Sequence, residues 1–394
     1  MVSSPAPAPT TDYAFLAAEL RERDAAAFVH VGDRFDDDQR YLTRFSGPDR
    51  DYAYVYVDGE AVLCAPALFE EQARREFPGD VVYAPADLDA EAPGQQAVEV
   101  LDAYDVGADE TVLVPQHLPH DAALYLDGAG VDLASTDAVA AARTTKSDAE
   151  VDCLRAVQAS AQRAMARVET FLAEAEQDGT ALTHEGERLT SERLRREANA
   201  VLAGEGVDPA ANTVVGVGET CADLHFRGDV PVDAGETVLV DLSPRGPHGY
   251  YGDLTRTFVV DAEGGWERRA HLAVQRAQDA AFDELDAGAG VAASLVHTET
   301  AAEVAAYGFD TGYDADTGFT HETGHGVGLS LHESPSLSDD VELAAGTVVT
   351  VEPGVYDPTE GGVRIEDLVV VTEDGFENLT DYPRSLVPEP REWV

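Results

Sequence analysis

Basic residues are scarce in this sequence. Its 394 residues include 76 Asp or Glu but only 26 Lys or Arg, which gives a formal net charge of −50, and Lys146 is the only lysine. A nucleic-acid-binding protein needs a basic face that displaces the counterions of the phosphates. Docking on an anionic membrane surface also depends on basic residues. The charge balance therefore argues against nucleic acid and against a membrane as partners.

Cysteine and long apolar runs are scarce as well. The three cysteines (Cys64, Cys153 and Cys221) are too few and too scattered for a disulfide framework or a zinc knuckle. No stretch approaches the roughly 18–20 uninterrupted apolar residues of a membrane-spanning helix. The N-terminal sequence MVSSPAPAPTTDY lacks the basic start and the apolar core of a signal peptide. We therefore expect a reduced, cytoplasmic protein whose residues 1–12 form a flexible tail.

The rest of the composition is typical of a folded protein. Hydrophobic residues make up 44% of the chain, which is enough for a core, and the length suggests two domains. The acidic excess is spread over the whole chain, and molar salt would screen the self-repulsion that it causes. Together with the near-absence of lysine, this pattern indicates a halophile. The alternative is an ordinary acidic protein of a mesophile.

Residues 13–145 have the pattern of a mixed α/β domain. Residues 17–27 have a helical pattern, and helical and extended patterns alternate after them. The segment YAYVYVDGEAVLCAP contains two alternating apolar runs around Asp58-Gly59, which is a strong hairpin signal. We expect a sheet with helices packed against it.

Residues 146–394 have the pattern of a second, larger domain. Ser147 and Glu150 form a capping box, which predicts a helix that runs to about residue 176. Three further helical patterns alternate with four extended stretches: helices at 191–202, 266–285 and 292–306, and strands in GETVLVDLS, GYYGDLTRTFVV, GTVVTVEPGVY and GGVRIEDLVVV. The chain is therefore expected to be an α/β (α+β) protein with two domains.

Two aspartates lie on one expected hairpin of the second domain. Asp241 ends an apolar run, and Asp253 follows 12 residues later, after a connection rich in Pro and Gly. A hairpin would bring the two carboxylates side by side. A buried carboxylate is costly unless its charge is matched, and a metal ion is one way to match it. The alternative is that both aspartates cap strand ends at the surface.

Three histidines gather in the segment THETGHGVGLSLHESP. His321, His325 and His332 lie within 12 residues, although the whole chain has only 11 histidines. Glycines at positions 324, 326 and 328 lie among them and would let other backbone segments approach closely. Imidazole is the commonest neutral metal ligand and a proton carrier near neutral pH. A lone histidine would usually be structural, but this cluster indicates a site.

Two glutamates interrupt β-branched runs that have the pattern of buried strands. Glu352 closes VVTVE, and Glu366 lies in GVRIED. Alternation along GVRIED places Arg364 and Glu366 on the face opposite Val363 and Ile365. Taken alone, Arg364 and Glu366 could be a surface ion pair on an edge strand. Taken with the aspartates and a histidine, the glutamates complete an oxygen-rich set of side chains.

Such a set fits divalent metal ions. Four carboxylates would neutralise the charge of two divalent ions, and bridging carboxylates commonly hold two such ions about 3.5–4 Å apart. No cysteine takes part, which argues against a structural zinc site. Ligation dominated by carboxylates suits Mn²⁺, with Co²⁺ or Zn²⁺ as alternatives.

The order of these motifs resembles that of the pita-bread metallopeptidases. An Asp, a second Asp about a dozen residues on, the His of GHG, the Glu of VEPG and the Glu of RIED follow the order seen in that family. The family includes methionine aminopeptidase, aminopeptidase P, prolidase and the metal-free creatinase. The resemblance covers roughly residues 146–390, and the preceding domain resembles that of creatinase and prolidase. It implies a creatinase-like N-terminal domain followed by a pita-bread catalytic domain.

The resemblance also assigns the metal ligands, position by position. The family pattern makes five residues the ligands of two metals: Asp241, Asp253, His325, Glu352 and Glu366. Asp253 and Glu366 would bridge the two metals. Glu352 also matches the glutamate that acts as the general base.

Four further residues match supporting positions of the family. His225, in CADLHFRGD, and His332, in LSLHESP, match two histidines beside the substrate. His321 matches the histidine that the proline-cleaving branch carries four residues before its histidine ligand. Arg364 matches the arginine that supports the bridging glutamate.

The resemblance implies hydrolysis of the peptide bond that precedes proline. The enzyme would be an Xaa-Pro aminopeptidase or an Xaa-Pro dipeptidase (prolidase), acting on short peptides through a metal-activated water, and it would be a homodimer. Another amide hydrolase of the same fold, such as one acting on a compatible solute, remains an alternative. A non-catalytic binding module is disfavoured because all five ligand positions are present.

Overall fold

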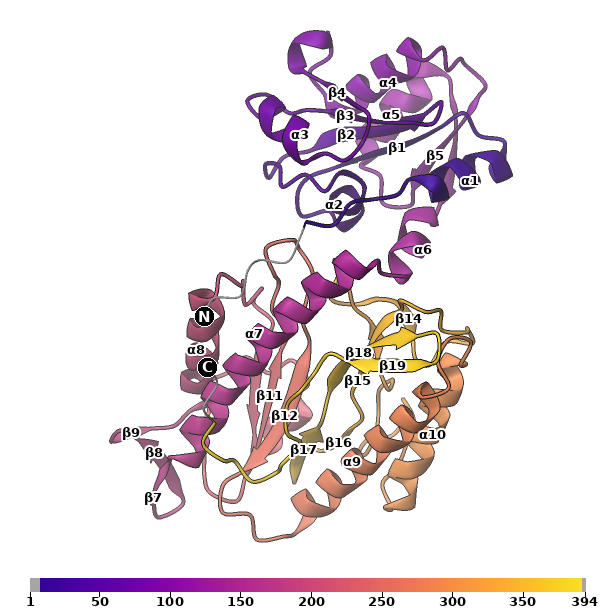
Figure 1. Ribbon diagram of the computed structural model, residues 1–394. Coiled ribbons are helices and arrows are strands. Elements are labelled where there is room, and N and C mark those ends of the chain that lie inside the picture. Colours follow the sequence, from indigo (N-terminus) through magenta and orange to yellow (C-terminus); the bar gives the residue numbers. More distant parts are fainter. Residues whose placement is uncertain (1–7, 392–394) are drawn as a thin grey trace. The chain divides into compact units, whose positions relative to one another are not determined.

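The computed structural model describes residues 8–391, which divide into two compact units (Figure 1). The N-terminal unit comprises Ala8–Arg143, and the C-terminal unit begins at Thr144. Of the tail predicted at residues 1–12, the first seven lie outside the described residues. Thr11 is buried, and its hydroxyl donates a hydrogen bond to the carbonyl of Tyr41.

The N-terminal unit is built on a mixed six-stranded sheet in the order β4-β3-β2-β1-β5-β6. Its strands are β1 (Ala27–Gly32), β2 (Tyr52–Val57), β3 (Glu60–Cys64), β4 (Val81–Tyr83), β5 (Thr111–Pro115) and β6 (Asp132–Thr136). Its helices are α1 (Ala14–Arg23), α2 (Asp37–Thr43), α3 (Glu70–Glu76), α4 (Pro93–Ala103), α5 (His120–Ala129) and α6 (Ala138–Thr144). Strand β1 pairs antiparallel with β2 and parallel with β5.

Both faces of the central strand β1 are buried. Val29 and Val31 point into the aliphatic core that α4 and α5 close on one face. Alternation along a strand sends the intervening residues to the other face, so that Phe28 and His30 are buried there. The predicted hairpin is confirmed, because β2 and β3 are joined by Asp58-Gly59. Both turn residues have positive φ, 52° and 80°, as a type I′ turn requires.

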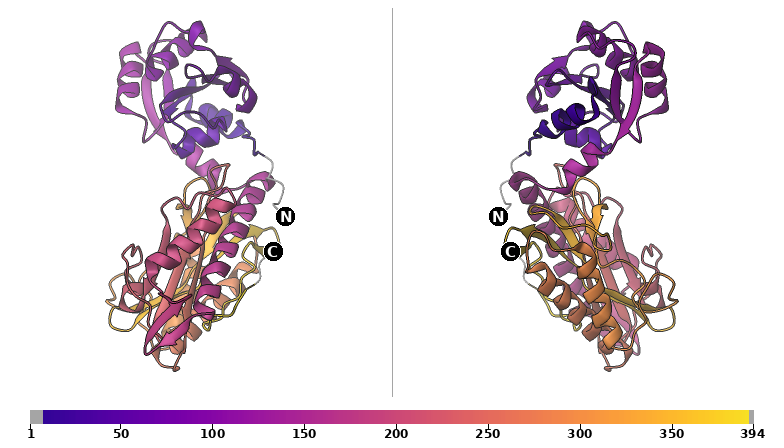
Figure 2. Two further views of the ribbon diagram at one scale, coloured as in Figure 1. Left: turned by 90° about the vertical axis from the view of Figure 1, so that its left-hand side faces the viewer. Right: turned by 90° about the vertical axis from the view of Figure 1, so that its right-hand side faces the viewer.

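The C-terminal unit layers two pairs of helices around its strands. Figure 2 shows α7 and α8 on one face and α9 and α10 on the opposite face. The helices are α7 (Asp148–Ala173), α8 (Ser191–Gly204), α9 (Trp266–Leu285) and α10 (Ala293–Ala306). The strands form a sheet β10-β11-β12, a sheet β14-β13-β15-β18-β19, a hairpin β16-β17 and a small sheet β7-β8-β9.

The strands of the C-terminal unit have the following bounds: β7 (Glu176–Asp178), β8 (Ala181–His184), β9 (Glu187–Arg188), β10 (Thr213–Val217), β11 (Thr237–Leu242), β12 (Leu254–Val259), β13 (His325–Gly326), β14 (Glu333–Ser336), β15 (Val348–Val351), β16 (Gly354–Asp357), β17 (Gly361–Arg364), β18 (Asp367–Thr372) and β19 (Gly375–Asn378). Aliphatic residues of α7 and α8 pack against β10, β11 and β12. Those of α9 and α10 pack against β15, β17 and β18. Each fully buried Val, Leu or Phe side chain stabilises the fold by about 1.5–3 kcal/mol, so this packing stabilises the strands between the helix pairs.

The mixed α/β class predicted from the sequence is confirmed, but several predicted bounds are wrong. Helix α1 ends at Arg23 rather than at residue 27, because Asp24 adopts the left-handed conformation (φ 50°) that ends a helix. Helix α7 ends at Ala173 rather than near residue 176. The stretch GYYGDLTRTFVV becomes a strand only from Leu254.

Two of the predicted strands are each divided in two. GTVVTVEPGVY contains β15 and β16, which Glu352 and Pro353 separate. Proline has no N–H to donate to a β-ladder, so it ends the pairing there. GGVRIEDLVVV contains β17 and β18, which Ile365 and Glu366 separate. Both breaks fall at acidic residues that the sequence singled out.

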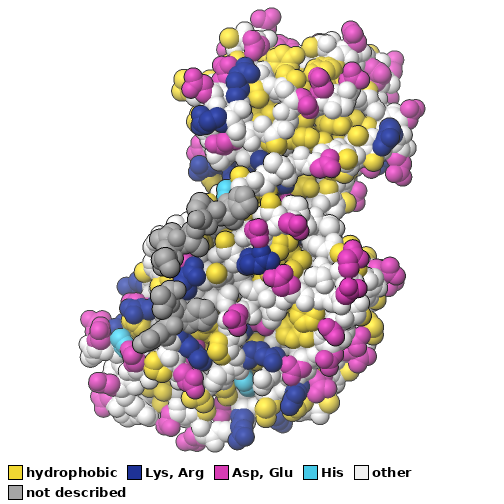
Figure 3. Space-filling model, viewed as in Figure 1, with side chains coloured by type: hydrophobic (Ala, Val, Ile, Leu, Met, Phe, Trp, Pro, Cys, Tyr) yellow, Lys and Arg dark blue, Asp and Glu magenta, His cyan; other side chains and the backbone are white. Residues whose placement is uncertain are grey.

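Acidic side chains are distributed over the surface of both units (Figure 3). No large patch of basic residues interrupts them on the face shown. Within the described residues, no helix combines the length and the apolarity that crossing a membrane requires.

Candidate metal centre

The β11–β12 hairpin carries the two aspartates. In its register Asp241 of β11 lies opposite Thr255 of β12, and Asp253 immediately precedes β12. The hydroxyl oxygen of Ser243 lies 2.9 Å from Asp253 Oδ1 and 3.3 Å from Asp241 Oδ1. The hairpin therefore brings the carboxylates together, as the sequence predicted, and Asp253 is buried.

His325 lies on β13 with its ring directed at the carboxylates. Its Nε2 is 3.3 Å from Glu352 Oε1 and 3.8 Å from Asp253 Oδ2. Its Nδ1 lies 3.1 Å from the carbonyl oxygen of Gly326, so Nδ1 carries a proton and donates it to that oxygen. A neutral His325 then presents the lone pair of Nε2 to the cluster, which is the arrangement of a metal-ligating histidine.

The glycines around His325 are required by the packing of neighbouring backbone. A Cβ added at Gly324 would collide with the carbonyl oxygen of Thr350 on β15. A Cβ added at Gly326 would collide with the backbone of Ser334 on β14. The segment THETGHG thus lets β13 lie close to both neighbours, as the spacing of its glycines predicted.

Glu352 and Glu366 enter the cluster from the two strand breaks. Glu352 follows β15, and the hydroxyl of Thr350 donates to its Oε1 at 3.0 Å. Glu366 lies between β17 and β18, and the hydroxyl of Thr255 donates to its Oε2 at 2.6 Å. Val363 and Ile365 point into the apolar core on the other side, as alternation predicted.

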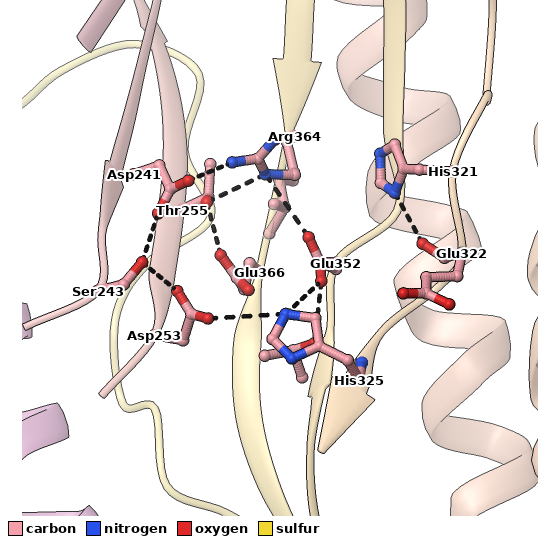
Figure 4. Close-up of polar contacts among 12 residues, drawn as sticks. Asp241, Ser243, Asp253, Thr255, His321, Glu322, His325, Glu352, Arg364 and Glu366 are labelled. Carbon is pink, nitrogen blue, oxygen red and sulfur yellow. Dashed lines mark hydrogen bonds and ion pairs between the residues drawn. The ribbon is translucent and has the colours of Figure 1, made fainter. Parts of the chain in front are cut away.

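Arg364 connects the two halves of the cluster. Its guanidinium donates to Asp241 Oδ2 at 2.6 Å, to Thr255 Oγ1 at 3.1 Å and to the Tyr356 hydroxyl at 3.0 Å. Figure 4 shows Arg364 reaching Asp241 on one side and facing Glu352 on the other. The buried Arg364 and Glu366 are therefore part of the site and not a surface ion pair.

His321 lies at the edge of this network. Its Nδ1 is 2.7 Å from the carbonyl oxygen of Glu322, and its Nε2 is 3.0 Å from the Tyr356 hydroxyl. Nδ1 therefore carries the proton, and the Tyr356 hydroxyl donates to Nε2. Burial lowers the pKa of His321, which agrees with a neutral ring in this position.

The cluster opens into a pocket of about 230 Å³. All nine residues that the sequence singled out line it: His225, Asp241, Asp253, His321, His325, His332, Glu352, Arg364 and Glu366. The His332 ring lies 4.3 Å from the His325 ring, centroid to centroid. His225 and His332 are exposed, whereas Asp253, His325 and Glu366 are buried. The pocket thus has a buried acidic floor and exposed histidines on its wall.

The carboxyl groups on the floor of the pocket are costly to ionise together. Burial and the charge of Asp241 raise the pKa of Asp253 well above its usual value, and burial and the charge of Asp253 do the same for Glu366. Burial also raises the pKa of Asp241, despite the opposing effect of Arg364. Each of these shifts means that the folded protein resists holding the carboxylates ionised together.

Glu352 and His325 behave as a coupled pair. Burial by itself would raise the pKa of Glu352, but the hydrogen bond and charge of His325 lower it to about 2. Burial by itself would lower the pKa of His325, but Glu352 and Asp253 raise it to about 9. In the absence of metal the His325 imidazolium therefore serves as a cation for the cluster.

The donor set fits divalent metal. Asp253, His325 and Glu366 each offer a ligand atom within 4.8 Å of the other two, and all three are buried. Asp241 and Glu352 adjoin them through Ser243 and His325. Four carboxylates around one arginine leave a net negative charge that divalent cations would neutralise. Four oxygen donors and one nitrogen donor are typical ligands of such ions.

Several residues that hold the cluster in place were missed in the sequence. The side-chain amide of Gln158 on α7 bonds both backbone groups of Asp253, at 2.7 and 2.8 Å. Arg256 on β12 donates to the carbonyl oxygen of Glu366 at 2.7 Å and forms an ion pair with Asp367 at 2.7 Å. Arg256 is only 1% exposed. In the sequence, the only sign of this role of Arg256 is that an arginine interrupts a strand of apolar and Thr residues.

Similar proteins supply the family context. The model of metallopeptidase family M24 matches residues 152–373, which is more than half of the chain. A probable dipeptidase PepE of Mycobacterium bovis is 33% identical over 261 residues, 65% of this chain and 64% of that protein. An Xaa-Pro dipeptidase of Pyrococcus furiosus is 35% identical over 209 residues, 51% of this chain and 58% of that protein. These matches span less than two thirds of either relative.

Solved structures extend the likeness to both units. The structure of an Xaa-Pro dipeptidase from Bacillus anthracis matches with a TM-score of 0.81 at 22% identity, over 95% of this chain and 98% of that one. At this identity the likeness shows the fold. The predicted fold, a creatinase-like N-terminal domain followed by a pita-bread catalytic domain, is thereby confirmed.

Proposed function

This chain belongs to metallopeptidase family M24, and we propose that it hydrolyses the peptide bond that precedes proline in dipeptides and short peptides. The observation that carries the proposal is the set of four carboxylates and His325, with Asp253, His325 and Glu366 buried, at the floor of a pocket walled by three further histidines. The names of the relatives, a probable dipeptidase and an Xaa-Pro dipeptidase, support the substrate class. A dipeptidase and an aminopeptidase specific for Xaa-Pro bonds are both within this proposal.

The metal would be held by Asp241, Asp253, His325, Glu352 and Glu366. Two divalent ions, Mn²⁺ in our proposal, would lower the pKa of a water molecule and polarise the scissile carbonyl. Mn²⁺ is favoured because four of the five donors are carboxylates.

The side chains of the pocket would divide the remaining work. Glu352 takes the proton of the attacking water and returns it to the leaving amine. His225 and His332 donate hydrogen bonds to the oxygen on which negative charge develops. Arg364 keeps Asp241 in position through its 2.6 Å bond and stays linked to His321 through Tyr356.

The proline preference is tested by hydrolysis rates on Ala-Pro, Ala-Pro-Ala and Ala-Ala in the presence of Mn²⁺. We expect kcat/KM on the better Xaa-Pro substrate to exceed that on Ala-Ala by at least about tenfold. The ratio of the two Xaa-Pro rates separates a dipeptidase from an aminopeptidase. In the same assay His332→Ala should lower kcat/KM by more than about tenfold while the metal content stays unchanged. Comparable rates on Ala-Pro and Ala-Ala would overturn the proline preference and leave the family assignment intact.

We further propose that the protein is adapted to high salt, on the basis of its formal net charge of −50. Its melting temperature should rise between roughly 0.1 and 2 M KCl, because the Debye length falls from about 10 Å at 0.1 M to about 3 Å at 1 M. Most of the rise should come at the low-salt end. Sucrose stabilises without screening charge, so a sucrose series is the control. A melting temperature that stays flat or falls in KCl would contradict the adaptation.

A further inference from the structure

The N-terminal unit contains a second group of side chains suited to a metal ion. His30 on β1, Asp36 at the start of α2 and His117 after β5 each offer one ligand atom within 4.8 Å of the other two. His30 Nε2 lies 2.9 Å from Asp36 Oδ1, and His117 Nε2 lies 3.5 Å from Asp36 Oδ2. We propose that these three residues bind a zinc ion.

The topology of the sheet explains why these residues meet. β1 and β5 are parallel neighbours, so their carboxyl ends lie at the same edge of the sheet. Asp36 follows β1, and His117 follows β5 by two residues. The edge at the carboxyl ends of parallel strands is where α/β sheets usually bind ligands. The group is therefore placed where a ligand site is expected.

One of the two spacings in this group agrees with a tetrahedral zinc site. With zinc–ligand distances of 2.0–2.2 Å, ligand atoms lie about 3.3–3.6 Å apart. The 3.5 Å between His117 and Asp36 meets this range, and the 2.9 Å between His30 and Asp36 is a hydrogen bond that the ion would replace. Two imidazoles and one carboxylate leave a fourth position for water. His117, with a side chain 54% exposed, leaves a route by which an ion can enter.

The surroundings favour a cation. Asp38 Oδ2 lies 3.6 Å from His117 Nε2, while Asp38 Oδ1 accepts a hydrogen bond from Arg143 at 2.7 Å. Burial raises the pKa of Asp51, and the nearby charges of Asp33, Asp121 and Asp36 raise it further. Burial alone would raise the pKa of Asp36, but its hydrogen bonds with His117 and His30 lower it, so Asp36 is ready to act as an anionic ligand. A divalent ion bound there would also offset the negative charge around Asp51, as His30 already does in part.

In the structure, His30 and Asp36 already belong to a hydrogen-bonded network that an ion would have to replace in part. Asp36 Oδ1 accepts bonds from His30 and from the backbone N–H of Gln39 at 2.7 Å, and this second bond caps α2. Metal binding through His30 Nε2 moves the proton of the ring to Nδ1, which has no hydrogen-bond partner among the described residues. We therefore expect this site to bind zinc more weakly than the candidate metal centre of the C-terminal unit does.

The test is zinc content, measured by elemental analysis of the full-length protein after dialysis against buffered free Zn²⁺. Two variants remove a ligand with little risk to the fold: His117→Ala at an exposed position, and Asp36→Asn, which keeps an oxygen to cap α2. Each should hold one zinc ion per chain fewer than the wild-type protein. The matched control is His120→Ala, an exposed histidine three residues further on, which should keep the wild-type content.

Two results would overturn the proposal. One is an unchanged zinc content in His117→Ala and Asp36→Asn. The other is an equal loss in His120→Ala, which would mean that zinc binds adventitiously to surface imidazoles. All the residues involved belong to the N-terminal unit, so the outcome does not depend on the proposed peptidase activity. When His117→Ala or Asp36→Asn is combined with Glu366→Gln, the zinc content should fall by the sum of the losses seen in the two single variants.

Discussion

Glu366→Gln should deplete the protein of metal and lower its peptide hydrolysis by more than about a hundredfold. The substitution keeps the size of the side chain and an oxygen for the 2.6 Å bond from Thr255, but it removes one negative charge from the buried floor of the pocket. Two cations are then less well neutralised, so they bind less tightly. Elemental analysis and turnover of the dialysed variant give the two readouts. Full occupancy with unchanged turnover would remove Glu366 from the ligand set.

The metal-free protein provides a second readout of the same substitution. In the folded apoprotein, burial and Asp253 raise the pKa of Glu366, so an ionised carboxylate there is unfavourable. The apo form of Glu366→Gln should therefore melt at the same temperature as the apo wild type or at a higher one. Added Mn²⁺ should raise the melting temperature of the wild type more than that of the variant.

A matched variant separates these effects from a general change in charge. Glu360→Gln alters the same kind of side chain at an exposed position on the connection between β16 and β17. It should keep the metal content, the turnover and the response to Mn²⁺ of the wild-type protein. If Glu360→Gln and Glu366→Gln behave alike, the loss of charge alone explains the result and the ligand assignment fails.

Three acidic residues of the candidate metal centre stand out in the sequence because each breaks an apolar pattern. Glu352 and Glu366 interrupt runs of β-branched residues, and Asp241 ends one, so each places an acid where the pattern demands an apolar side chain. The strands around the two glutamates are buried: Glu352 lies at the break between β15 and β16, and Glu366 at the break between β17 and β18. A charged side chain among buried strand residues needs a partner. The sequence alone shows where such a residue interrupts an apolar run.

The residues that position the ligands could not be predicted, because their partners are remote in the sequence. Gln158 lies on α7, 95 residues before the Asp253 backbone that it bonds. Arg256 and Glu366 are separated by 110 residues. A glutamine on a helix and an arginine on a strand have ordinary surface explanations until the fold shows them buried. Their role depends on how α7 packs on β12, which no local pattern encodes.

Lys146, the only lysine in the sequence, forms a buried ion pair in the C-terminal unit. Lys146 Nζ lies 3.0 Å from Glu333 Oε2 and also donates to the carbonyl oxygen of Thr144 at 3.2 Å. The side chains of Lys146 and Glu333 are 2% and 6% exposed. Removing one partner of a buried ion pair leaves the other charge without its counterion and costs about 3–5 kcal/mol. Lys146→Met should therefore destabilise the C-terminal unit by about that amount.

Calorimetry gives the measurement, because a loss of this size lowers the melting temperature of a unit this large by roughly 6–20 °C. The double variant Lys146→Met/Glu333→Gln should recover much of the loss, since a neutral pair of similar volume avoids burying a charge. Lys146→Arg keeps the charge but must fit a larger planar group into the same space. Its melting temperature should therefore lie between those of the wild-type protein and Lys146→Met.

The ion pair of Lys146 and Glu333 also affects the pocket of the candidate metal centre. Glu333 directly follows His332, and its Oε1 accepts the backbone N–H of Ser330 at 3.0 Å. The carboxylate that Lys146 neutralises therefore also closes the turn that carries His332 to the pocket wall. Lys146→Met should lower kcat/KM at a temperature at which the variant is still folded. The double variant should not restore kcat/KM fully, because an amide binds the Ser330 N–H less strongly than a carboxylate does. Equal melting temperatures for the single and the double variant would show that packing around Lys146, and not its charge, stabilises this region.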